Sequence, residues 1–140
     1  MPNSIVPWVP RPIRGLLGPL ATSAAGMLRQ QRFMEVIATN IANAETTRTP
    51  DGGPYRRQIA TASVDPASGR TVTTVQEDQT PGRLVYDPGH PDADDSGYVR
   101  YPNVDLATEA VDLMIARRLH EANVSAFQAA KAMLRRALEI

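Results

Sequence analysis

The sequence predicts an α+β protein in which two long terminal helices pair as a coiled-coil-like helical hairpin beside a small β-rich middle unit. Apolar residues recur every three or four positions over residues 16–44 and again over residues 104–140. Between them, residues 45–103 hold seven of the eight prolines that lie beyond residue 15, which argues against helix there. Residues 1–15 are rich in proline and lack periodicity, and we expect them to form a flexible arm.

Composition narrows the classes of function. Fifteen basic and fifteen acidic residues give a formal net charge of zero, so the chain has no electrostatic footprint for nucleic acid or for an anionic membrane. The absence of cysteine excludes disulfides, thiolate zinc sites and cysteine nucleophiles. The sequence contains no run of about 18 apolar residues, so we expect no membrane-spanning helix. The first fifteen residues lack the continuous apolar stretch of a secretory signal.

The first helix is predicted from a heptad-like stripe with one polar interruption, at Gln31. Pro19 suits a first helical turn, and Asn43 is expected to end the helix because asparagine tolerates the left-handed conformation. The stripe consists of Leu20, Ala24, Met27, Met34, Ala38 and Ile41.

The middle unit is predicted to contain short antiparallel strands. Residues 55–64 and 70–76 carry β-branched and alternating side chains on either side of the five-residue turn 65–69, which indicates a hairpin. Further extended pieces are expected at 83–86 and 97–101. Because the chain has few aromatic residues, this β unit can have only a thin core.

The second helix is expected from Asp105, as its N-cap, to the end of the chain, since no glycine or proline follows Asn103. It carries two apolar stripes, which together are more than one partner helix can cover, so the helix should contact several neighbours. One stripe is Ile115, Leu119, Ala122, Ala126, Ala129, Met133 and Ile140, and the other is Leu113, Val124, Phe127, Leu134 and Leu138.

The stretch most like a ligand site is the acidic Asp87–Asp95 loop. Asp92, Asp94, Ser96 and Gly97 match the opening positions of an EF-hand calcium loop. The match then fails, because the glutamate expected at the twelfth position is Asn103. A turn-rich loop is the favoured interpretation. A small calcium- or ligand-binding module that uses this loop stays open as the alternative.

A hydrolytic enzyme that uses His90 with Asp87 or Asp92 is a distant third hypothesis. No serine or cysteine nucleophile is paired with this histidine, so a solvated or turn-packing role is favoured. Arg56 and Arg57 are interpreted as solvated or salt-bridged residues at a strand edge. We therefore predict no catalytic residues, no metal ligands and no cofactor.

Three segments together resemble the flagellar basal-body rod proteins. Residues 34–47 are similar to the N-terminal signature shared by rod, hook and hook-filament junction proteins, the flagellar axial family. Residues 47–57, and residues 84–93 with 97–104, look like the proximal rod subunits in particular. The family motif residues are Asn40, Ile41, Ala42, Asn43, Ala44, Thr46, Thr47, Asp51, Gly52, Gly53, Pro54 and Tyr55. One departure is His120, which stands where the family usually has an aromatic residue.

The resemblance implies a structural subunit of the proximal rod that transmits torque through helix packing and has no chemistry of its own. Its partners would be itself, other flagellar rod proteins and the flagellar type III export apparatus, with no nucleic acid and no membrane insertion. Its place would be the periplasm-spanning rod of the basal body, reached without a cleaved signal peptide. The expected assembly interface comprises Met27, Met34, Ile41, Ile115, Leu119, Val124, Phe127, Leu134 and Leu138.

Overall fold

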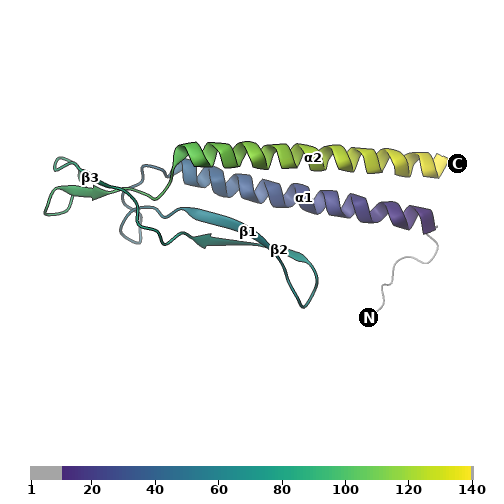
Figure 1. Cartoon of the computed structure of the whole chain (residues 1–140), viewed down its shortest axis with the longest axis horizontal. Coiled ribbons are helices and arrows are strands. Elements are labelled where there is room, and N and C mark those ends of the chain that lie inside the picture. The colour runs from purple at the N-terminus through teal and green to yellow at the C-terminus, as the bar shows by residue number, and fades with distance from the viewer. Residues whose placement is uncertain (1–10, 140) are drawn as a thin grey trace. The chain divides into compact units, whose positions relative to one another are not determined.

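The computed structural model describes residues 11–139, and the expected arm over residues 1–10 and the final Ile140 lie outside the described residues. Two long helices, α1 (Arg11–Ala42) and α2 (Leu106–Glu139), enclose in sequence a β region of two small sheets (Figure 1). The α+β class is confirmed. The chain divides into two compact units: residues 1–30 with 117–140, and residues 31–116. They are called the helical unit and the mixed unit below.

Helix α1 begins five residues earlier than expected. The stretch Arg11–Gly15 is helical, so the predicted start at Leu16 is wrong for these residues. Pro19 therefore lies inside the helix and not in its first turn. Proline's fixed φ is compatible with helix, and its cost there is one missing backbone hydrogen bond and crowding against the carbonyl four residues earlier.

The end of α1 is close to where the sequence placed it, but the mechanism differs. The helix ends at Ala42, and the next residue, Asn43, is not left-handed, because no described residue other than glycine has a positive φ. Instead, the Asn43 amide Nδ2 donates to the carbonyl of Thr39 at 2.9 Å, and its Oδ1 accepts from the Thr46 hydroxyl at 3.1 Å. Asn43 thus stops the helix by hydrogen bonding with its side chain.

The mixed unit contains the predicted hairpin, and the two further extended pieces that were expected pair as a second one. Strand β1 (Gln58–Val64) pairs antiparallel with β2 (Thr71–Glu77), and β3 (Leu84–Tyr86) pairs antiparallel with β4 (Tyr98–Arg100). The first strand begins at Gln58 and not at Tyr55, because the preceding residues belong to the hydrogen-bonded cluster described below. The β3–β4 hairpin has one buried face, centred on the fully buried Val99, which fits the expected thin core.

Helix α2 starts as predicted, directly after an aspartate N-cap. The Asp105 carboxylate accepts from the backbone N–H groups of Ala107 and Thr108, both at 3.3 Å. These bonds lower the pKa of the Asp105 carboxyl, with the Thr108 side chain as the largest cause and the Ala107 backbone next. The cap is confirmed.

The positions that α1 buries are not the predicted apolar stripe. In the helical unit the buried residues of α1 are Ser23, Gly26 and Gln30. The predicted polar interruption, Gln31, is exposed, and its neighbour Gln30 is the buried polar residue. In the helical unit α1 therefore packs a face of small and polar side chains inside its own chain, and part of its apolar surface is left for other contacts.

Candidate functional site

A hydrogen-bond cluster in the mixed unit is built around the family-motif residue Asn40, whose side chain is 1% exposed. Its Nδ2 donates to the carbonyl of Gln58 at 2.8 Å and to Glu109 Oε2 at 3.1 Å. Its Oδ1 accepts from the Tyr55 hydroxyl at 2.8 Å and from the Gln58 N–H at 2.9 Å. All four hydrogen-bonding positions of the amide are thus occupied. One asparagine joins the end of α1, the start of β1 and the start of α2.

The second half of this cluster is a buried ion pair that sequence reasoning missed. Glu109, in the first turn of α2, is fully buried and accepts from Arg57 Nε at 2.5 Å. Arg57 also reaches Asp112 at 3.3 Å, and its backbone N–H donates to Asn103 Oδ1 at 2.7 Å. Of the two alternatives expected for Arg57, solvated or salt-bridged, the structure shows the salt bridge, with its partner on a helix 52 positions away in sequence.

Burial, followed by the nearby Glu109 and Glu77 carboxylates, raises the pKa of the Tyr55 hydroxyl. The phenol is therefore held in its neutral, hydrogen-donating form next to Asn40.

The motif turn that follows α1 is fastened to the acidic loop. The Thr47 hydroxyl donates to Asp92 Oδ2 at 2.7 Å, and Arg48 Nε lies 3.0 Å from Asp92 Oδ1. Gly52 and Gly53 adopt φ values of 84° and 76°, which only glycine takes at low cost, and they close the turn through hydrogen bonds to Thr49. Two of the three resembling segments therefore touch each other.

Two of the four loop carboxylates, those of Asp92 and Asp94, are used internally. Asp94 Oδ1 accepts from the N–H groups of Ser96 and Tyr98, both at 2.9 Å, and His90 Nδ1 accepts from the Asp92 N–H at 3.0 Å. The His90 ring also packs near the Tyr101 ring, with centroids 6.3 Å apart. Among residues 11–139, no three His, Asp or Glu side chains gather in a way that could hold a metal ion. The geometry gives the calcium and hydrolase alternatives no support.

The expected interface residues divide into two groups. Six are half-buried within their own units, and three on α2 are exposed. Ile115 is 52% exposed and Leu119 is 48% exposed, and Met133 of the same predicted stripe is 57% exposed. The exposed three of the predicted set are Ile115, Leu119 and Leu138, and the half-buried six are Met27, Met34, Ile41, Val124, Phe127 and Leu134.

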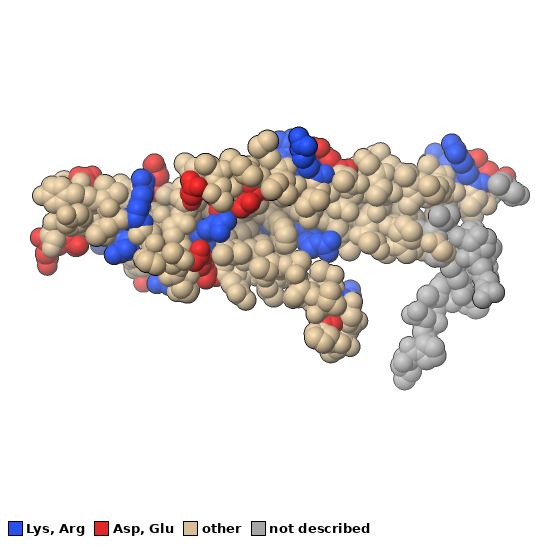
Figure 2. All heavy atoms as spheres, viewed as in Figure 1, with Lys and Arg blue, Asp and Glu red and all other residues tan. Residues whose placement is uncertain are grey.

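The two α2 stripes therefore have different environments. The stripe that contains Phe127 and Leu134 faces the chain's own packing, whereas the stripe from Ile115 through Leu119 to Met133 remains outside. An apolar stripe of this length on a helix is typical of an interaction surface. None of the described helices has the length and hydropathy needed to cross a membrane. Figure 2 shows positive and negative side chains interspersed on the face drawn.

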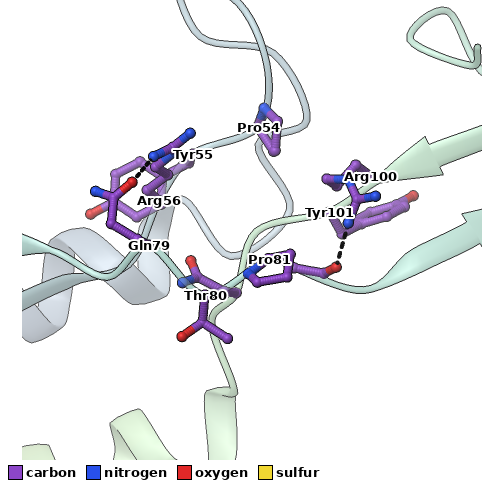
Figure 3. A pocket seen from close by; sticks show the side chains of 10 residues that line it. Pro54, Tyr55, Arg56, Gln79, Thr80, Pro81, Arg100 and Tyr101 are labelled. Carbon is purple, nitrogen blue, oxygen red and sulfur yellow. Dashed lines mark hydrogen bonds between the residues drawn. The ribbon is translucent and has the colours of Figure 1, made fainter.

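A shallow hollow of about 170 Å³ lies beside the base of the β3–β4 hairpin (Figure 3). Arg56 and Arg100 stand on opposite sides of it in this view, with Thr80 and Pro81 between them. Arg56 is hydrogen-bonded to Gln79, and Arg100 Nη1 donates to the carbonyl of Gly82 at 3.1 Å. The remaining lining residues include Pro54, Tyr55, Tyr101 and Asn103.

Sequence comparisons agree with these features. Residues 20–48 match the family described as flagella basal body rod protein, and residues 95–140 match the flagellar basal body rod FlgEFG protein C-terminal family. Flagellar basal-body rod proteins FlgC from Borreliella burgdorferi and Salmonella typhimurium are each 38% identical to the chain. These alignments cover 90% and 89% of the chain, and 97% of each relative.

FlgC from Bacillus subtilis is also 38% identical, over 86% of the chain and 95% of that protein. The matched ranges contain the Asn40 motif, the Asp105 cap and the outer stripe of α2. The chain belongs to the FlgC family of flagellar basal-body rod proteins.

Proposed function

We propose that the chain is a structural subunit of the flagellar basal-body rod and that it assembles through the outer stripe of α2. The observation that carries the proposal is the exposure of Ile115, Leu119 and Met133 on a helix whose other apolar stripe is already packed. A helix that is apolar on two sides requires more than one packing partner. Its family relatives are named as rod proteins, and a rod supplies such partners through neighbouring subunits.

The pairing of α1 with α2 as a coiled-coil-like hairpin is part of this proposal. Contacts inside each unit support it. In the helical unit, a side chain added at Gly26 would meet the Asn123 amide 2.5 Å away, so the two backbones approach closely there. In the mixed unit, Asn40 on α1 bonds directly to Glu109 on α2. In both places the contact is small or polar, as at positions that fix the register of a coiled coil.

Place, partners and mechanics follow from the same proposal. The subunit would lie in the periplasm-spanning proximal rod, contact copies of itself and other rod proteins, and transmit torque through packed helices. It would arrive through the flagellar type III export apparatus without a cleaved signal. We keep the fourfold division as a prediction about the assembled state. It consists of an arm (1–15), a first core helix (16–44), a β unit (45–103) and a second core helix (104–140). The first helix now extends into the arm, to Arg11.

The test is to place a charge on the outer stripe. Leu119→Asp should remove the subunit from isolated basal bodies. An unpaired carboxylate in a packed helix interface weakens the free energy of association by about 2–4 kcal/mol. Gln128→Asp is the matched control, since it adds the same charge at an exposed polar position of the same helix. It should leave incorporation nearly unchanged.

Phe127→Asp addresses the inner stripe and should lower stability of the isolated chain as well as incorporation, because Phe127 is half-buried in its own unit. Secretion of each variant into the culture medium must be measured in parallel, so that a failure to be exported is not read as a failure to assemble. Basal bodies that contain the Leu119→Asp chain at normal abundance would refute assembly through the outer stripe.

A further inference from the structure

The mixed unit carries opposite charges at the two ends of its β3–β4 hairpin. The loop at the tip, residues 87–97, contains four aspartates and no lysine or arginine. The base of the hairpin carries Arg83 and Arg100, and Arg100 shares the lining of the hollow in Figure 3 with Arg56. Figure 2 shows acidic side chains over the loop that follows β3. One small hairpin thus has an acidic tip and a basic base.

The basic base lacks carboxylate partners of its own. Among residues 11–139, Arg56 and Arg100 make no ion pair, although each is held in place by one hydrogen bond to a neutral group. No Asp or Glu lines the hollow. Asp78 directly precedes the lining residues Gln79 and Thr80 in sequence. Its Oδ1 accepts from the Thr80 N–H at 2.9 Å. Each guanidinium has further N–H groups, which suit a carboxylate.

The acidic tip also keeps charge in excess. Asp92 is paired with Arg48 and Thr47, and Asp94 caps its own turn. Asp87 and Asp95 are exposed and make no ion pair within the part of the chain that the structure describes. A second hollow, of about 260 Å³, is lined by Arg100 together with Asp92 and Asp94, so it already contains carboxylates. The hollow between Arg56 and Arg100 is the one that lacks an anion.

We propose that the acidic tip of one copy, through Asp95 and Asp87, docks in the hollow between Arg56 and Arg100 of a second copy. When each copy offers its tip to one neighbour and its base to another, the contact is heterologous, and repeating it produces an open filament. The inference rests on the proposed function, because such a contact is useful only in a growing assembly. Charge complementarity of this kind sets register and speeds encounter more than it adds affinity.

The contact can be trapped with cysteines, because the natural chain has none. Thr80→Cys lies in the hollow and Ser96→Cys lies on the tip, and both positions are exposed. Basal bodies isolated from cells that express the two single-cysteine chains together should yield a dimer with a short bis-maleimide cross-linker. Ser68→Cys, at the exposed β1–β2 turn, replaces Ser96→Cys as the control and should give about tenfold less product, because this turn is not part of the proposed contact.

Charge reversal tests the electrostatic basis. A tip-reversed chain, Asp87→Arg with Asp95→Arg, and a base-reversed chain, Arg56→Glu with Arg100→Glu, should each give about tenfold less cross-linking when present alone. Mixed together, they should recover the unmodified yield to within about twofold, because every tip then meets a base of opposite sign. Recovery on mixing is not expected from variants that merely misfold.

The outcomes separate the two proposals. Incorporated chains that cross-link no better through Ser96→Cys than through Ser68→Cys would overturn the tip-to-base contact and leave the rod assignment standing. Equal yields from the charge-reversed chains alone and mixed would overturn it too. Absence of the unmodified chain from basal bodies would overturn both proposals.

Discussion

The two compact units differ in how their buried polar groups are hydrogen-bonded. In the mixed unit the buried polar groups of Asn40 and Glu109 are fully engaged by partners. In the helical unit the buried Gln30 Oε1 and His120 Nδ1 have no hydrogen-bond partner within the described residues. An unsatisfied buried polar atom costs about 1–3 kcal/mol, whereas a satisfied network makes a structure rigid and specific. We therefore expect the mixed unit to be the more stable part of the subunit.

The largest expected effect comes from breaking the mixed unit at its ion pair. Glu109→Ala leaves Arg57 and the Asn40 amide without their carboxylate, and it should lower the free energy of unfolding by about 3–5 kcal/mol. All four tyrosines lie in residues 31–116, so the near-ultraviolet circular dichroism of tyrosine during urea unfolding reports on this unit.

The control for this variant is Asp112→Ala, which removes the other carboxylate near Arg57. The Asp112 side chain is 42% exposed, so its loss should cost about 1 kcal/mol or less. Equal effects of the two substitutions would mean that burial of Glu109 does not set the strength of the cluster.

The next effect comes from the central amide. Asn40→Ala removes partners from the Gln58 N–H, the Gln58 carbonyl and the Tyr55 hydroxyl together, and it should cost about 2–3 kcal/mol in the same urea experiment. Asn43→Ala is a matched control three residues away, where the side-chain bonds lie at a partly exposed helix end and are worth about 1 kcal/mol. If Asn43→Ala were the more damaging change, the motif would serve the helix end and not the cluster.

A smaller change should strengthen the weak unit. Gln30→Leu replaces a buried amide that has an unpartnered oxygen by an apolar side chain of similar length, and it should stabilise the helical unit by about 1 kcal/mol. Amide exchange of residues 119–134 should then slow by about fivefold in the isolated chain, since 1 kcal/mol corresponds to that factor.

Replacing a buried amide by leucine in the mixed unit should have the opposite effect. Asn40→Leu should destabilise the mixed unit, because there the amide has all its partners. Faster exchange in Gln30→Leu would show that Gln30 has a partner in solution and that the contrast between the units is false.

The sequence predicted features that depend on local rules. A few adjacent or periodic residues predict the Asp105 cap, the β1–β2 hairpin, the extended segments of β3 and β4, and the two stripes of α2. The helix start at Arg11 was missed because Pro12 and Pro19 argue against helix locally, although neither prevents it. The sequence predicts the helix end near Asn43 from a left-handed conformation, which Asn43 does not adopt. Its side-chain hydrogen bond to Thr39 could not be predicted from the residue type alone.

The Asn40 cluster could not have been predicted residue by residue. Asn40 reads as the end of an apolar helix, Arg57 as a strand-edge charge and Glu109 as an ordinary first-turn acid, and only the tertiary fold brings them together. The resemblance did single out Asn40 and Tyr55 as motif residues, without a physical reason. Which stripe of α2 would stay outside was equally open, because periodicity defines a face but not what covers it.

The smallest expected effect is an acid sensitivity confined to the mixed unit. Hydrogen bonds from their own turns lower the pKa of Asp65, Asp78 and Asp105, all of which lie in residues 31–116. A carboxyl with a lowered folded-state pKa binds its proton less readily in the native than in the unfolded state. Its contribution is therefore present above the ordinary pKa of 3.8 and is lost as pH falls through the folded-state value.

The free energy of unfolding, measured by tyrosine dichroism in urea, should therefore fall below about pH 4, the ordinary range of aspartate. Amide exchange in the helical unit should change little for this reason. Asp105→Asn isolates one group, because asparagine caps a helix about as well but does not titrate. The variant should match the unmodified protein at neutral pH and lose less stability on acidification. If both proteins lose stability equally between about pH 5 and pH 2, the Asp105 cap contributes nothing to the acid sensitivity.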